Sequence, residues 1–164
     1  LNPKFIIISF FLFATVMNCT MLNLNEEGRN DLEVNNERMA QQFVSALKGQ
    51  DIEQIEELLS QDFQFVIASD PLIVPGSGSQ SRALFLNTLK TRELKEFELE
   101  VLDSFVQRNK VAISVSVRAK GPYSEYNNRI QFKFTFRNKK IVEVKEFSDS
   151  IEILKAFMPE RLDT

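Results

Sequence analysis

The feature that most constrains this chain is a change of hydrophobic period near residue 97. From there on, four stretches alternate apolar and polar residues: FELEVLDSFV (97–106), VAISVSVRA (111–119), RIQFKFTF (129–136) and IVEVKEF (141–147). A period of two indicates strands with one dry and one wet face. The links at 107–109 and 137–140 have hairpin length, so the pattern predicts an antiparallel sheet.

One parity of these strands is apolar and predicts the inner face of the sheet. In the last strand, Val142 and Val144 have this parity, and the residue that follows them at the same spacing is Glu146. Either this carboxylate enters the interior and can accept a proton, or the strand leaves the core there and the charge lies in water. Its position at a strand end favours the second interpretation. The predicted inner face comprises Phe97, Leu99, Val101, Val111, Ile113, Val115, Val117, Ile130, Phe132, Phe134, Phe136, Val142 and Val144.

The preceding part of the chain has helical periodicity. Met39, Phe43 and Leu47 fall on one helical face, and a second helix follows with Asp51 as its N-cap. A short strand is expected at 62–69, a third helix at 82–90, and a last helix after an N-cap at Asp149. Helices followed by an antiparallel meander predict an α+β fold in which the N-terminal helices pack on a curved sheet.

Composition excludes several kinds of chemistry. The chain has no His, and its single Cys is Cys19 in the N-terminal region. His-activated nucleophiles, His metal ligands and a Cys nucleophile in the body are therefore excluded, and we expect neither a metal nor a cofactor. The net charge of −3 argues against nucleic-acid binding.

The N-terminus resembles an export signal. Residues 5–17, FIIISFFLFATVM, form an uncharged apolar run after Lys4. This run is too short to span a bilayer. We expect a signal peptide at 1–20, hence a secreted protein with no membrane segment in its mature form. A polar linker is expected at 21–36, one domain at 37–158 and a tail at 159–164.

Two segments resemble the nuclear transport factor 2-like superfamily, which includes ketosteroid isomerase and the SnoaL-like polyketide cyclases. QFVSALKGQDIEQIEELLSQDFQF (42–65) is similar to its opening helix pair and first strand, and KKIVEVKEFSD (139–149) to its closing strand. The resemblance covers roughly residues 37–150. It implies a cone-shaped fold whose mouth holds a small apolar molecule.

The resemblance also implies where catalytic groups would lie. Ketosteroid isomerase combines a carboxylate base with a Tyr and a protonated Asp. The positions that match this Tyr and Asp hold Phe43 and Phe132 here. Asp70 could stand in for the base and act with Glu146, although Asp before Pro is also a common turn residue. The expected wall of the ligand pocket is Phe43, Val115, Phe132, Phe134 and Val144, and Tyr123 and Tyr126 could lie at its rim.

We therefore expect a secreted, non-catalytic domain that binds a small apolar ligand or mediates dimer contacts. A homodimer would form through the outer face of the sheet. Two alternatives stay open. The first is an isomerase- or cyclase-type enzyme that uses Asp70 and Glu146 on a hydrophobic substrate. The second is a purely structural protein-interaction domain whose interior is filled by its own Phe side chains.

Overall fold

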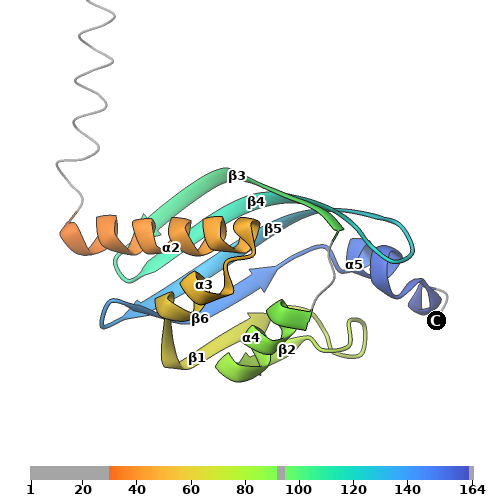
Figure 1. The fold of residues 1–164 in the computed structure, drawn as a ribbon, viewed down its shortest axis with the longest axis horizontal. Coiled ribbons are helices and arrows are strands. Elements are labelled where there is room, and N and C mark those ends of the chain that lie inside the picture. Colours follow the sequence, from red (N-terminus) through yellow and green to blue (C-terminus); the bar gives the residue numbers. More distant parts are fainter. Residues whose placement is uncertain (1–29, 92–94, 163–164) are drawn as a thin grey trace, which may run out of the picture.

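In the computed structural model, residues 30–91 and 95–162 are described. Helices pack against a curved six-stranded sheet with the strand order β2-β1-β6-β5-β4-β3 (Figure 1). The predicted signal peptide and most of the predicted linker lie outside the described residues. The elements are α2 (Asp31–Gly49), α3 (Ile52–Leu58), β1 (Leu59–Ile67), β2 (Gly78–Ser81), α4 (Arg82–Thr91), β3 (Lys95–Gln107), β4 (Lys110–Lys120), β5 (Glu125–Arg137), β6 (Lys140–Phe147), α5 (Ser150–Phe157) and the short 3₁₀ helix η1 (Pro159–Arg161).

The predicted α+β architecture is confirmed. Strands β3 to β6 form an antiparallel meander with the predicted hairpin links. Helix α2 packs on β3 and β4, α4 on β1, and α5 on β5. None of the helices in the described part of the chain is long and apolar enough to cross a membrane.

The sheet is mixed, which hydrophobic periodicity did not predict. Strand β1 pairs in parallel with β6, and β2, which lies between the expected strand at 62–69 and the expected helix at 82–90, pairs antiparallel with β1. Parallel neighbours are joined by long connections, so no local sequence pattern specifies their pairing. This pairing places the first and last strands of the described part of the chain side by side, as the second and third strands of the sheet (Figure 1).

The predicted inner face is wrong at Val101 and Val142, each of which lies beside a bulge. The register of β3 shifts between Val101 and Asp103, and Val101 is 49% exposed. The register of the β5–β6 pair shifts next to Phe136, so Ile141 is fully buried and Val142 is only partly buried. A bulge adds one residue to one strand and moves the following side chains to the other face.

Helix α2 begins at Asp31, so residues 31–36 of the expected linker are helical. Polar contacts hold this first part of the helix to the β3–β4 turn. The Glu33 carboxylate accepts a hydrogen bond from the Arg108 backbone N–H at 2.6 Å. The buried Asn36 side chain donates to the Arg108 carbonyl at 3.0 Å. Because these contacts are polar, they leave no apolar periodicity in the sequence.

Candidate functional site

A largely apolar cavity of about 420 Å³ lies between the inner face of the sheet and the helices α4 and α5. Its wall includes Phe65 of β1, Val117 of β4, Phe132 of β5 and Phe157 of α5. The volume is within the range of small-molecule sites in proteins. Segments far apart in the sequence supply the wall, so the cavity exists only once the sheet has curved around the helices.

Helix α5 closes one side of the cavity with Ile153 and Phe157. The Asp149 side chain caps this helix by accepting a hydrogen bond from the Ile151 backbone N–H at 2.8 Å, which confirms the predicted N-cap. At the other end of α5, the Tyr123 backbone N–H donates to the Ala156 carbonyl at 3.2 Å. Contacts at both ends therefore fix α5 against β5 and the β4–β5 turn.

Four lining side chains carry hydrogen-bonding groups: Gln80, Thr88, Tyr126 and Glu146. Glu146 is the one charged residue among the described residues of the wall. It is half-buried, and its Oε1 accepts a hydrogen bond from the Ser148 hydroxyl at 3.0 Å. The alternation of β6 thus places Glu146 in the cavity wall, whereas the strand-end interpretation had placed it in open water.

Tyr126 and Asn128 extend the inner row of β5 toward the β4–β5 turn. Tyr126 is 7% exposed and Asn128 is 6% exposed. The Asn128 side chain donates to the Tyr126 hydroxyl at 3.0 Å and to the Asp149 carbonyl at 3.0 Å. Tyr126 was expected at the rim of the pocket, and Asn128 was not singled out from the sequence. Counting the period of two backward from Ile130 would have found both residues.

The environment keeps the Tyr126 phenol neutral. Burial raises the pKa of Tyr126 far above the ordinary tyrosine value, and the negative charge of Glu146 raises it further. The hydrogen bond from Asn128 acts in the opposite direction with a smaller effect. The wall therefore holds a neutral O–H group, which can donate a hydrogen bond, and a carboxylate, which can accept one.

Asp70 does not share this wall with Glu146. Its side chain is exposed, and its Oδ1 accepts a hydrogen bond from the Leu72 backbone N–H at 2.9 Å. Its carbonyl accepts from the backbone N–H of Val74 at 2.8 Å. Asp70 thus shapes the turn that brings Val74 and Pro75 to the cavity, while its carboxylate lies outside the lining.

Of the five residues expected to form the ligand pocket, Phe132 lines the cavity. The other four, Phe43, Val115, Phe134 and Val144, are completely buried in the core. Phe43 lies edge-on to Phe134, with ring centroids 5.4 Å apart, and stacks at 6.2 Å on Phe85, a wall residue. These four side chains therefore belong to the core behind the wall, where Phe43 contacts both Phe134 and the wall residue Phe85.

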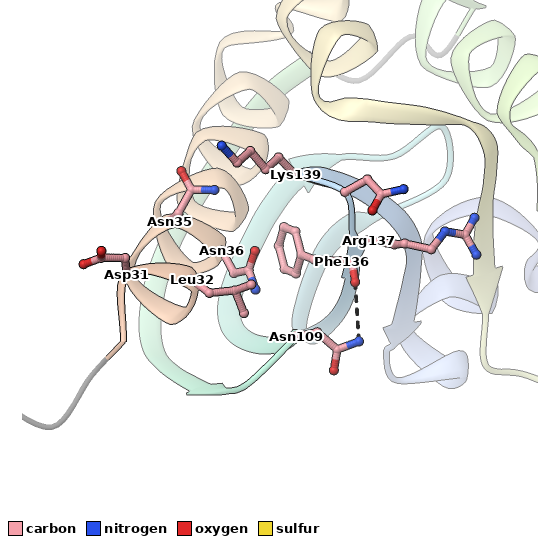
Figure 2. A pocket seen from close by; sticks show the side chains of 9 residues that line it. Asp31, Leu32, Asn35, Asn36, Asn109, Phe136, Arg137 and Lys139 are labelled. Atoms are coloured by element: carbon pink, nitrogen blue, oxygen red, sulfur yellow. Dashed lines mark hydrogen bonds between the residues drawn. The ribbon is translucent and has the colours of Figure 1, made fainter.

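A second cavity of about 500 Å³ lies at the opposite end of the sheet, beside the first turns of α2 (Figure 2). Its wall combines Leu32 and Phe136 with polar side chains such as Asn109 and Lys139. The Asn109 side chain donates to the Phe136 carbonyl at 3.4 Å. Within residues 30–91 and 95–162, no group of three or more His, Cys, Asp or Glu residues could hold a metal ion in either cavity.

Solved structures share this architecture. A pinacolase from Penicillium brevicompactum superposes with a TM-score of 0.68 at 19% identity, over 82% of this chain and 95% of that one. A protein from Jannaschia sp. CCS1, named as a candidate SnoaL-like polyketide cyclase, gives 0.64 at 15% identity, with coverages of 78% and 94%. An NTF2-like protein of unknown function from Burkholderia pseudomallei gives 0.66 at 12% identity, with coverages of 76% and 98%. At these identities the likeness establishes the fold alone.

Sequence comparison identifies the family. No curated protein matches the chain. The family model of the SnoaL-like domain, however, matches residues 40–144, from the second half of α2 to the middle of β6. This match covers more than half of the chain and includes all of the first segment on which the resemblance was based (42–65) and residues 139–144 of the second. The protein therefore belongs to the SnoaL-like domain family and has the fold of nuclear transport factor 2-like proteins.

Proposed function

We propose that this domain binds a small, largely apolar molecule in the cavity between the sheet and helices α4 and α5. The observation that carries the proposal is the cavity itself: about 420 Å³ of space with a mostly hydrophobic wall and a few polar groups. Sites for small molecules have this composition, in which apolar surface supplies affinity and a few polar groups fix orientation. The same observation argues against an interior filled entirely by the protein's own Phe side chains.

Blocking the cavity tests the proposal. Val117→Phe places a larger side chain in the wall, whereas Val101→Phe makes the same change at an exposed position of β3. The neutral probe N-phenyl-1-naphthylamine, which fluoresces in apolar surroundings, should bind saturably to the wild type and to Val101→Phe. Val117→Phe should lose binding while its circular dichroism spectrum is unchanged. Absence of saturable binding by the wild type, or equal binding by both variants, would refute the proposal.

A second function, catalysis of the isomerase or cyclase type, is favoured by one observation. Glu146, a candidate proton acceptor, lies in the same wall as Tyr126, a candidate proton donor. Because Asp70 lies outside this wall, Tyr126 would replace it as the partner of Glu146, with Glu146 as the base and Tyr126 as the acid. Acid and base groups in one apolar pocket can move a proton between two carbons of a bound ketone.

The experiment for this second function follows conjugation by ultraviolet absorbance, with a β,γ-unsaturated ketone as substrate. Glu146→Gln should abolish turnover and keep the binding of N-phenyl-1-naphthylamine, because Gln has nearly the same size and cannot take up the proton. Turnover that survives in Glu146→Gln would exclude Glu146 as the base. A wild type that binds the ketone without converting it would leave ligand binding as the function.

We also propose that the chain is exported, on the basis of the apolar run at 5–17. Expression of the full chain in a secretory host, followed by N-terminal sequencing of protein from the medium, tests this. A new N-terminus near residue 20 is the expected result, and retention of the intact chain inside the cells would contradict it.

A further inference from the structure

We infer that Tyr126 is the hydrogen-bond donor of the cavity and that Asn128 is the positioning residue that keeps it in this role. The ligand should accordingly be a neutral apolar molecule that carries an acceptor oxygen, such as a carbonyl, ether or hydroxyl oxygen. This inference rests on the proposed binding function and goes beyond it by naming the class of ligand.

Two hydrogen bonds to the backbone determine the orientation of the Asn128 amide. Its Oδ1 accepts a hydrogen bond from the Asp149 backbone N–H at 3.0 Å, and its Nδ2 donates to the Asp149 carbonyl at 3.0 Å. A flipped amide would set N–H against N–H and carbonyl against carbonyl. Because a backbone donor and a backbone acceptor cannot exchange roles, the two contacts to Asp149 determine which end of the amide is the NH₂ group.

This orientation determines the role of the phenol. Nδ2 of Asn128 has a second hydrogen, and it lies 3.0 Å from the Tyr126 hydroxyl oxygen. An amide NH₂ group only donates, so the phenol oxygen must accept this hydrogen bond. The phenol proton is therefore directed away from Asn128. Because Tyr126 lines the cavity, a molecule bound there can offer an acceptor to the phenol proton.

The Tyr126 ring is held in place as well. Phe157 of α5 packs against it, with ring centroids 5.3 Å apart and planes at 61°. Asn128 also connects Tyr126 to the backbone of the α5 N-cap, Asp149. Both the ring and the hydroxyl are thus fixed before a ligand enters, which lowers the entropy lost on binding.

The remaining polar groups narrow the class of ligand. Glu146 adds a negative charge to the same wall and raises the pKa of Tyr126 more than any other charged group. A carboxylate in an apolar wall repels an anionic ligand, because the low local dielectric strengthens the repulsion. Fatty-acid anions are therefore disfavoured, whereas a neutral ketone, ether or alcohol can accept the hydrogen bond from Tyr126.

Two naphthalene probes of similar shape test the inference. 2-Acetylnaphthalene has an acceptor oxygen and 2-isopropylnaphthalene has none. Their affinities for the wild type and for Tyr126→Phe are measured by equilibrium dialysis. The ratio of ketone affinity to hydrocarbon affinity should fall about fivefold to tenfold in Tyr126→Phe, the expected effect of one buried hydrogen bond. Binding of the hydrocarbon should be unchanged, which also shows that the variant is folded.

Infrared spectroscopy of the bound ketone separates a hydrogen bond from a change of packing. The carbonyl stretch should lie at lower frequency in the wild-type complex than in the Tyr126→Phe complex. In Asn128→Asp, a carboxylate that can only accept would draw the Tyr126 proton toward itself. The carbonyl stretch should then move to the Tyr126→Phe frequency although the phenol is present.

The possible results distinguish a failure of the proposed binding function from a failure of the role inferred for Tyr126. If the wild type bound neither naphthalene, the proposed function would be overturned, and this inference with it. If both probes bound, but the affinity ratio and the carbonyl frequency were the same in Tyr126→Phe as in the wild type, this inference alone would be overturned. Because Tyr126→Phe keeps the ring, it decides the matter even if Asn128→Asp does not fold.

Discussion

Tyr126 combines a buried aromatic ring with a hydroxyl group that must be hydrogen-bonded inside an apolar wall. Asn128 satisfies the oxygen, and Phe157 packs against the ring. The cost of burying these polar groups is offset because both ends of the Asn128 amide are bonded to the backbone of Asp149. At this scale, a group that looks like a ligand-binding residue is also part of the connection between β5 and α5.

The raised pKa of Tyr126 predicts a loss of stability at alkaline pH. Between the ordinary tyrosine pKa of about 10 and the higher pKa of the folded state, the unfolded chain releases a proton that the folded chain keeps. The free energy of unfolding should therefore fall as pH rises above about 10. Urea unfolding of wild type and Tyr126→Phe between pH 8 and 11 tests this, and the fall should be less steep in the variant.

A spectroscopic measurement checks the same prediction. The chain contains only two tyrosines, so Tyr123→Phe leaves Tyr126 as the sole source of phenolate absorbance. That absorbance should appear together with unfolding and not before it. A phenolate signal at the ordinary tyrosine pKa, in protein that is still folded by circular dichroism, would contradict the burial of the hydroxyl.

At the scale of elements, α5 depends on the close approach of the β4–β5 turn. A Cβ atom added at Gly121 would lie 2.7 Å from the Ala156 carbonyl oxygen and 2.9 Å from the Ser124 carbonyl oxygen. Both neighbours are backbone atoms, which cannot move aside without shifting the helix or the turn. The packing of α5 against the β4–β5 turn therefore requires Gly121. Helix α5 in turn supplies part of the cavity wall.

Gly121→Ala should lower the free energy of unfolding by about 1–3 kcal/mol, the usual cost of a steric clash in a packed interior. It should also weaken probe binding, because α5 is displaced. The matched control is Gly49→Ala at the end of α2, where an added Cβ has no atom within 4 Å. This control should gain up to about 1 kcal/mol from its better helix propensity. Equal stability of the two variants would contradict the close packing of α5 on Gly121.

At the scale of the whole molecule, the sheet exposes apolar side chains that the helices do not cover. Leu102 and Phe105 on the edge strand β3 are 47% and 64% exposed, and Phe147 on β6 is 43% exposed. Leu102 borders a hollow of about 440 Å³ that it shares with Arg118 and Arg129. The predicted homodimer through the outer face of the sheet remains a prediction, and these residues are the positions at which it can be tested.

Sedimentation velocity tests the homodimer over a range of concentrations. The wild type should shift toward a dimer as concentration rises. Phe105→Lys should remain a monomer, because burying an unpaired ammonium group in an interface is unfavourable. Leu84→Lys, at a similarly exposed position on α4, is the control and should dimerise like the wild type. A monomeric wild type at the highest concentration would end this prediction.

The sequence alone determined the local features of the protein. The four-strand meander, the inner rows of β4 and β5 and the caps at Asp51 and Asp149 were all predicted, and the structure confirms them. Each depends on residues within a few positions of one another, through side-chain period or a hydrogen bond to a nearby backbone N–H. The resemblance to the family was also based on two short segments, 42–65 and 139–149, and the family model confirms it.

The tertiary structure alone decided where the polar groups meet. The bulges beside Val101 and Phe136 changed which residues face inward, and the parallel β1–β6 pairing completed the wall that contains Glu146. The bonds from Asn128 to Asp149 join residues 21 positions apart. Strand register and long-range pairing depend on how the whole sheet closes around its helices. No local pattern records that closure, so only the folded chain shows the cavity and the residues that line it.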